Sequence, residues 1–176
     1  MIISVNKLKE YITTDVKDAV LEDKLKALEL LIRKHTNNNF QNRNIRYRVN
    51  IADNSIVCPV TYFDNEDTIQ ISESDVNSGK YTIKAAQTNI STLEIKERLY
   101  DEDSVLITKI VYPYDIILGA VNMLKWDLEN RDKVGIQSET ISRHSVTYFN
   151  MDGDNSMIGY PKSLCGFMKP YMKARF

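Results

Sequence analysis

The side chains that most often carry out chemistry in proteins are few in this chain and lie far apart. His35 and His144 are its two histidines, and neither has a second ligand at the spacing of a metal site. Cys58 and Cys165 show no C-x-x-C spacing and have no histidine nearby in the sequence. We therefore expect no metal centre and no cysteine nucleophile, and we interpret the cysteines as buried or half-buried thiols of a reducing compartment.

Motifs for nucleotides, phosphates and acyl transfer are also missing from the sequence. It contains no G-x-x-x-x-G-K-[ST], G-x-G-x-x-G or G-x-S-x-G pattern. The stretch Asp152-Gly153-Asp154-Asn155 has its glycine between the aspartates and no later glutamate, which favours a surface loop over a calcium loop. Asp101-Glu102-Asp103 is interpreted as a solvated turn. The sequence thus predicts no cofactor and no enzymatic reaction.

Charge is nearly balanced over the chain but unevenly distributed. The 176 residues carry a formal charge of −1, with 43% hydrophobic and 27% charged residues, which is typical of a folded domain without a nucleic-acid-binding field. Residues 45–112 hold 7 basic and 11 acidic residues, whereas residues 161–176 hold 4 basic and no acidic ones. The basic tail is either a docking element or merely a soluble end. No signal peptide is visible, and the longest apolar run, at residues 116–121, is too short for a bilayer. We expect a cytoplasm-like compartment and no membrane partner.

The elements that must position these residues are predicted from periodicity. Apolar residues at helical spacing predict helices over residues 4–12, 18–35 and 113–134, with Pro113 in a first turn and Gly135 as a stop. Gly119 lies inside the third helix, which indicates close packing there. A last short helix starts at Pro161.

Residues 45–112 have a different pattern. Five or six short alternating segments, separated by turn residues such as Asn77-Ser78-Gly79, predict a small β-barrel or sandwich. The predicted fold class is therefore α+β: a small helical bundle of three main helices plus a short C-terminal helix. The bundle spans residues 1–44 and 113–176 with its tail, and the β domain is inserted at residues 45–112.

One further extended segment has no evident hairpin partner. Such a lone strand exposes backbone groups that invite pairing with another chain; the alternative is that it joins the β domain and that the tail is disordered. Its residues, the candidate inter-subunit strand, are Thr140, Ile141, Ser142, Arg143, His144, Ser145, Val146, Thr147 and Tyr148.

The order of these motifs resembles a known protein family. Tyr112-Pro113 with its helix, Gly135 to Tyr148, Gly159-Tyr160-Pro161 and the close on Pro170 to Phe176 are similar to head–tail connector (adaptor) proteins of siphoviruses infecting Gram-positive bacteria. The opening helices and the β insert fit the same family, so that the resemblance covers nearly the whole chain.

The resemblance implies a structural virion protein made in the bacterial host cytoplasm. In that family twelve copies form a ring under the portal protein, extend the channel for passing double-stranded DNA without sequence-specific binding, and carry the stopper and tail. The C-terminal segment embraces the portal. Carried over to this sequence, the portal-binding candidates are Lys169, Tyr171, Lys173, Arg175 and Phe176. Met172 and Ala174 depart from the arginine-rich tails of the family.

An alternative function uses the β insert. Small barrels commonly stack bases of single-stranded nucleic acids on aromatic side chains, and Tyr62, Phe63 and Tyr81 are candidates for that role. The excess of four acidic charges in the insert argues against this alternative.

Overall fold

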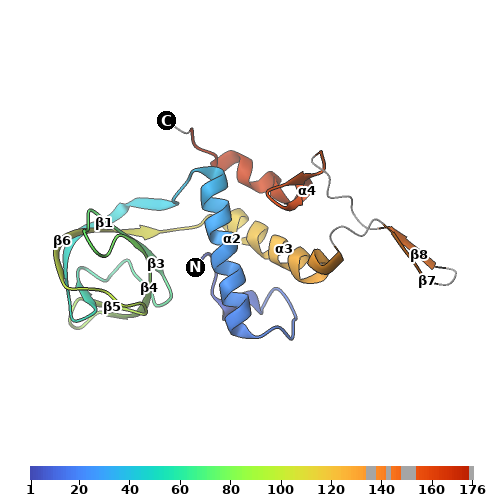
Figure 1. Cartoon of the computed structure of the whole chain (residues 1–176). Coiled ribbons are helices and arrows are strands. Elements are labelled where there is room, and N and C mark those ends of the chain that lie inside the picture. The colour runs from blue at the N-terminus through green and yellow to red at the C-terminus, as the bar shows by residue number, and fades with distance from the viewer. Residues whose placement is uncertain (134–137, 142–143, 148–153, 175–176) are drawn as a thin grey trace. The chain divides into compact units, whose positions relative to one another are not determined.

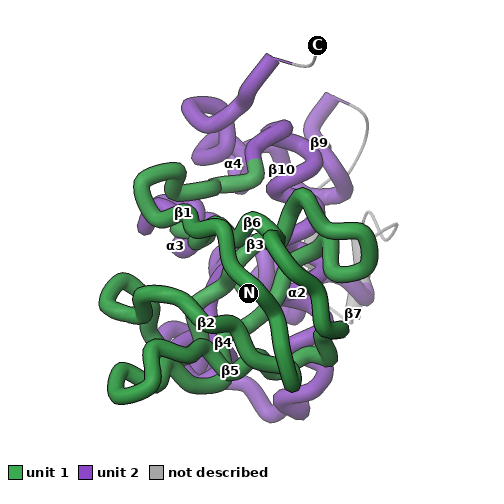
Figure 2. Tube along the Cα trace, turned by 90° about the vertical axis from the view of Figure 1, so that its left-hand side faces the viewer, with its two compact units in different colours: residues 1, 39–112 green, residues 2–38, 113–176 purple. Residues whose placement is uncertain are grey.

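The chain folds into two compact units. The computed structural model describes residues 1–133, 138–141, 144–147 and 154–174. Met1 and Asn39–Tyr112 form a β unit, while Ile2–Asn38 and Pro113–Phe176 form a helical unit (Figure 2). From Ile2 the chain begins the helical unit, crosses into the β unit at Asn39 and returns to the helical unit at Pro113.

The β unit is a closed antiparallel barrel of six strands (Figure 1). Neighbours follow the order β1-β2-β5-β4-β3-β6, and β6 pairs with β1 to close the barrel. Closure leaves no open sheet edge in the barrel. The strands are β1 (Gln41–Ala52), β2 (Ser55–Val57), β3 (Thr68–Ser72), β4 (Gly79–Gln87), β5 (Thr92–Ile95) and β6 (Glu102–Ile110).

Alternation along the strands fills the barrel interior. Val49 and Ile51 of β1 are buried while Asn50 between them is exposed, and Val49 pairs in register with Val105 of β6. Ile71 of β3 lies opposite Ile107 in the same way. A period-two pattern of branched apolar residues is what a half-buried strand requires.

The helical unit is built on two long helices, α2 (Asp18–Thr36) and α3 (Tyr114–Asn130). Shorter elements complete its described part: α1 (Val5–Leu8), η1 (Arg131–Lys133), β9 (Ser156–Met157), β10 (Tyr160–Pro161), α4 (Lys162–Cys165) and η2 (Gly166–Tyr171). Leu21, Leu25, Leu28 and Ile32 form the buried stripe of α2, as its sequence predicts. No helix in the described ranges has the length and apolarity to cross a membrane.

The predicted fold class is wrong, because the described chain holds no bundle of three main helices. The helix expected over residues 4–12 is reduced to the four residues of α1. Beyond it, the amides of Glu10 and Tyr11 bond to the carbonyls of Lys7 and Leu8, three residues back, so the backbone tightens and leaves the helical path. With α4 also only four residues long, α2 and α3 are the two long helices of the described chain.

The lone exposed strand is also a wrong prediction. Ser138–Ile141 (β7) and His144–Thr147 (β8) pair with each other as an antiparallel hairpin, with Ser138 opposite Thr147 and Ile141 opposite His144. The two residues between the strands, Ser142-Arg143, include none of the glycine or asparagine that mark a two-residue hairpin turn. The sequence pattern therefore merges both strands into one.

Candidate functional site

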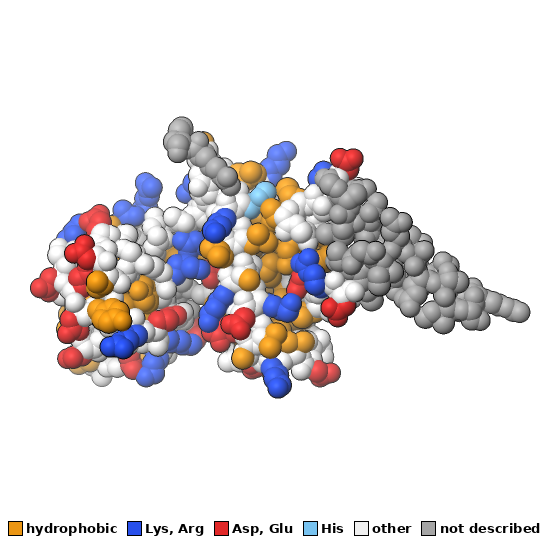
Figure 3. All heavy atoms as spheres, in the orientation of Figure 1, with side chains coloured by type: hydrophobic (Ala, Val, Ile, Leu, Met, Phe, Trp, Pro, Cys, Tyr) orange, Lys and Arg blue, Asp and Glu red, His pale blue; other side chains and the backbone are white. Residues whose placement is uncertain are grey.

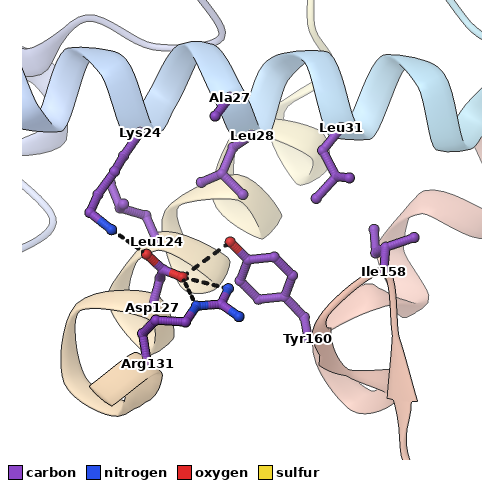
Figure 4. Close-up of a pocket in the computed structure, with 9 residues that line it drawn as sticks. All are labelled: Lys24, Ala27, Leu28, Leu31, Leu124, Asp127, Arg131, Ile158 and Tyr160. Atoms are coloured by element: carbon purple, nitrogen blue, oxygen red, sulfur yellow. Dashed lines mark hydrogen bonds and ion pairs between the residues drawn. The ribbon is translucent and has the colours of Figure 1, made fainter. Parts of the chain in front are cut away.

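A buried carboxylate near the end of α3 joins three parts of the helical unit. Asp127 is 9% exposed. Lys24 of α2 approaches one carboxylate oxygen to 2.5 Å, and Arg131 approaches the other to 2.5 Å through Nε (Figure 4). The hydroxyl of Tyr160 in β10 donates to Asp127 Oδ1 at 3.4 Å. Burial by itself raises the pKa of Asp127, but hydrogen bonds and charge from Lys24 and Arg131 outweigh it, so the pKa is lowered.

Arg131 extends this network to the turn between β9 and β10. Its guanidinium carbon lies 5.2 Å from the ring centre of Trp126 and 4.8 Å from that of Tyr160. Its Nη1 donates to the carbonyl of Gly159 at 3.0 Å. A planar cation that lies over both rings and pairs with a carboxylate holds the β9–β10 turn against α3.

Beside the network lies an apolar cavity of about 460 Å³, which we call the helical cavity. Figure 4 shows Leu31 of α2 and Ile158 of the β9–β10 turn lining one part of it, with Lys24, Asp127 and Arg131 gathered at the other. In Figure 3 hydrophobic side chains gather along and beside α2, with lysine and arginine side chains around them. The cavity thus combines apolar walls with a charged end.

The chain's C-terminal segment is held at the end of α2. Asn37 takes the left-handed conformation that ends the helix, with φ of 50°. The carbonyl of Thr36 accepts from the amide of Lys173 at 2.8 Å. The side-chain amides of Asn37 and Asn38 donate to the carbonyls of Ala174 at 2.7 Å and Tyr171 at 3.1 Å. We call these three bonds the tail clip; they hold the backbone of residues 171–174.

Two contacts fasten η2 to α3. The hydroxyl of Tyr171 reaches both carboxylate oxygens of Asp115, at 2.7 and 2.8 Å, and this hydrogen bond raises the pKa of Tyr171. Farther along α3, a Cβ added to Gly119 would lie 2.5 Å from ring atoms of Phe167. The close packing expected at Gly119 is confirmed.

The structure separates the tail candidates by their surroundings. Lys169 and Lys173 have exposed side chains. Tyr171 is partly buried and bonded to Asp115 of its own chain. Arg175 and Phe176 lie outside the described residues.

The inter-subunit candidates fall on and beside the β7–β8 hairpin. Thr140 and Ile141 belong to β7, and residues 144–147 form β8. Ser142, Arg143 and Tyr148 lie outside the described residues. The hairpin pairs the two strands with each other, so Thr140 faces Ser145 in register.

The aromatic residues of the alternative function are not equally accessible. Phe63 is buried in the barrel core, Tyr81 is partly buried and Tyr62 is 57% exposed. Both cysteines are buried and free, as expected, and burial raises the pKa of Cys58 to about 11. Within the described ranges, no three His, Cys, Asp or Glu side chains come together as a metal site.

Sequence reasoning missed the Asp127 network. One signal for it exists, because Asp127 continues the helical spacing of the buried residues Ile116, Ala120 and Met123, and Arg131 follows it one turn later. Lys24 lies 103 residues away in the chain and has no such local signal.

Comparison with protein-family models finds no match for this chain, and no curated protein matches it either.

Proposed function

We propose that this chain is a structural, non-enzymatic subunit of a bacteriophage neck, a head–tail connector that assembles as a ring under the portal protein. In this proposal it is made in the bacterial cytoplasm and ends in the virion. It continues the channel for double-stranded DNA and carries the stopper and tail. The number of copies expected from the family resemblance is twelve.

The observation that carries the proposal is the tail clip. A C-terminal segment with two exposed lysines, Lys169 and Lys173, is held by its backbone at the end of α2. Because its backbone is already ordered, less conformational entropy is lost when a partner binds. The side chains remain available for an acidic partner surface, and this segment is the one that embraces the portal in the family that the sequence resembles.

Binding to portal rings of the same phage tests the proposal. We expect rings of this chain on purified portal by negative-stain microscopy and native mass spectrometry. The double variant Lys169→Glu, Lys173→Glu should bind at least tenfold more weakly, since each lost contact between charged groups costs about 1 kcal/mol or more. Lys162→Glu, a matched control, changes an exposed lysine of α4 that is not a portal-binding candidate, and this variant should bind normally.

Absence of portal binding in every assembly state would refute the proposal. A gel shift with single-stranded DNA at low salt separates it from the alternative function. Retarded DNA together with no portal binding would favour a nucleic-acid-binding module.

A further inference from the structure

A rigid loop of the barrel presents an apolar side chain to solvent. We call residues 73–78 the Val76 loop. Glu102 at the start of β6 holds it from one side: Ser74 Oγ donates to the carboxylate at 2.6 Å, the amide of Asp75 at 2.6 Å and the side-chain amide of Asn77 at 2.7 Å. Three donors on one carboxylate fix both the backbone and the side chains of the loop.

Asn77 holds the loop from the other side. Its side chain is completely buried. Its amide nitrogen donates to the carbonyl of Tyr100 at 2.9 Å, and its carbonyl oxygen accepts from the amide of Tyr100 at 2.9 Å. The backbone amide of Asn77 also donates to Ser74 Oγ at 2.6 Å. The loop is therefore pre-organised, which is what a recognition element on a rigid scaffold requires.

This loop combines two properties at its surface. Val76 is 60% exposed, and the exposed Asp75 precedes it. Ile90, which is similarly exposed at 61%, lacks this combination, because residues 87–92 around it carry no charge. A fixed apolar side chain next to an acid fits an apolar pocket with a cationic end.

The helical cavity has the complementary chemistry. Ala27, Leu31 and Ile158 supply its apolar walls, and Lys24 and Arg131 stand at its charged end against the single carboxylate of Asp127. Two cations and one anion leave a local excess of one positive charge. Asp75 would balance this excess beside an inserted Val76.

The two units also differ in net charge. Residue 1 with residues 39–112 holds 8 Lys and Arg against 11 Asp and Glu, a charge of −3. Residues 2–38 with 113–176 hold 15 against 13, a charge of +2. The barrel of one copy therefore attracts the helical unit of another. A contact between two different surfaces of identical chains is heterologous, and such contacts generate rings when the rotation closes.

We propose that the Val76 loop of one copy inserts Val76 into the helical cavity of the next copy, with Asp75 facing Lys24. Repetition of this contact around a ring rests on the proposed function. The contact itself requires only two copies of the chain and no portal protein. It joins the barrel of one subunit to the helices of its neighbour.

Cross-linking between separately purified variants tests the contact. Val76→Cys mixed with Ala27→Cys should give a covalent dimer with a short bismaleimide, both at high protein concentration and on portal rings. Two matched controls should give at least tenfold less: Ile90→Cys with Ala27→Cys, and Val76→Cys with Lys26→Cys. Lys26 is exposed and adjacent to Ala27 on α2 but does not line the cavity. Asp75→Lys in the first variant should lower the yield.

Each outcome decides between the two proposals. Copies that assemble on the portal without the Val76–Ala27 cross-link would overturn this contact and leave the connector function standing. The specific cross-link without portal binding would leave the contact standing and refute the connector function. Equal yields from all pairs, or no association of copies at any concentration, would overturn the contact.

Discussion

Adding one methyl group to α3 measures how tightly the C-terminal segment is seated. In Gly119→Ala the new Cβ would lie 2.5 Å from ring atoms of Phe167, so the ring must move. Overpacking of this kind costs about 1–3 kcal/mol, whereas alanine in place of a helical glycine gains about 1 kcal/mol. We expect a net loss of about 1 kcal/mol in the free energy of unfolding of the helical unit.

Urea unfolding followed by Trp126 fluorescence measures this loss, because Trp126 is the single tryptophan of the chain and lies in the helical unit. The control is the same substitution in a Phe167→Ala background, where the clash is absent. There Gly119→Ala should stabilise by about 0.5–1 kcal/mol. A coupling of about 2 kcal/mol in the double-mutant cycle is therefore expected. If Gly119→Ala stabilises equally in both backgrounds, the ring does not pack on this glycine and the reasoning fails.

Three further predictions follow from charge and burial. Asp127→Ala leaves two cations without their shared carboxylate and should lower the free energy of unfolding by about 2 kcal/mol in the same urea assay. This is less than for a fully buried pair, because both cations are partly exposed. Lys24→Met should lower it by less, because Arg131 still pairs with Asp127. Cys58, whose pKa is raised to about 11 by burial, should react with a thiol reagent at pH 8 only after denaturation, and fast reaction of the folded chain would contradict its burial. Hydrogen bonds from Ser74 and from residues 75–77 lower the pKa of Glu102 below its ordinary 4.5. The ionised carboxylate therefore stabilises the Val76 loop fully above pH 4.5, and this stabilisation is lost as the pH falls through the lowered pKa. Hydrogen exchange of the loop amides should show this loss, and Glu102→Gln should abolish the pH dependence.

Elements with a long regular period were predictable from the sequence. The stripe from Leu21 to Ile32 predicts α2, and alternation between turn residues predicts the strands around Ile69 and Ile107. Apolar spacing in α3 predicts a stripe of Ile117, Val121, Leu124 and Leu128, which is only partly right. Val121 and Leu124 are buried, whereas Ile117 and Leu128 are half-buried and Asp127 takes a buried position. A hydrophobicity pattern cannot predict a buried carboxylate, because the burial of such a group depends on cations from other elements.

Short elements and long-range polar contacts were not predictable. The segment at residues 4–12 has helical spacing, but the helix stops after the four residues of α1. These four residues already bury Leu8 completely. Asparagines at positions 37–39 are typical of a helix end, and α2 does end there, at Thr36. Nothing local indicates that the side chains of Asn37 and Asn38 bond to backbone carbonyls more than 130 residues later.

The two ends of the C-terminal segment are held by the same helix. Near the start of α2, Lys24 joins the Asp127 network that holds the β9–β10 turn through Arg131, and at the end of α2 Thr36 accepts the amide of Lys173. The segment between these points cannot move as a free tail, because displacing it breaks bonds at both ends. A partner that binds the exposed lysines therefore meets an ordered backbone. A force on these lysines reaches α2 through the bonds at both ends of the segment. In the connector that we propose, load on the C-terminal segment would therefore be carried by α2, the longest helix of the described residues.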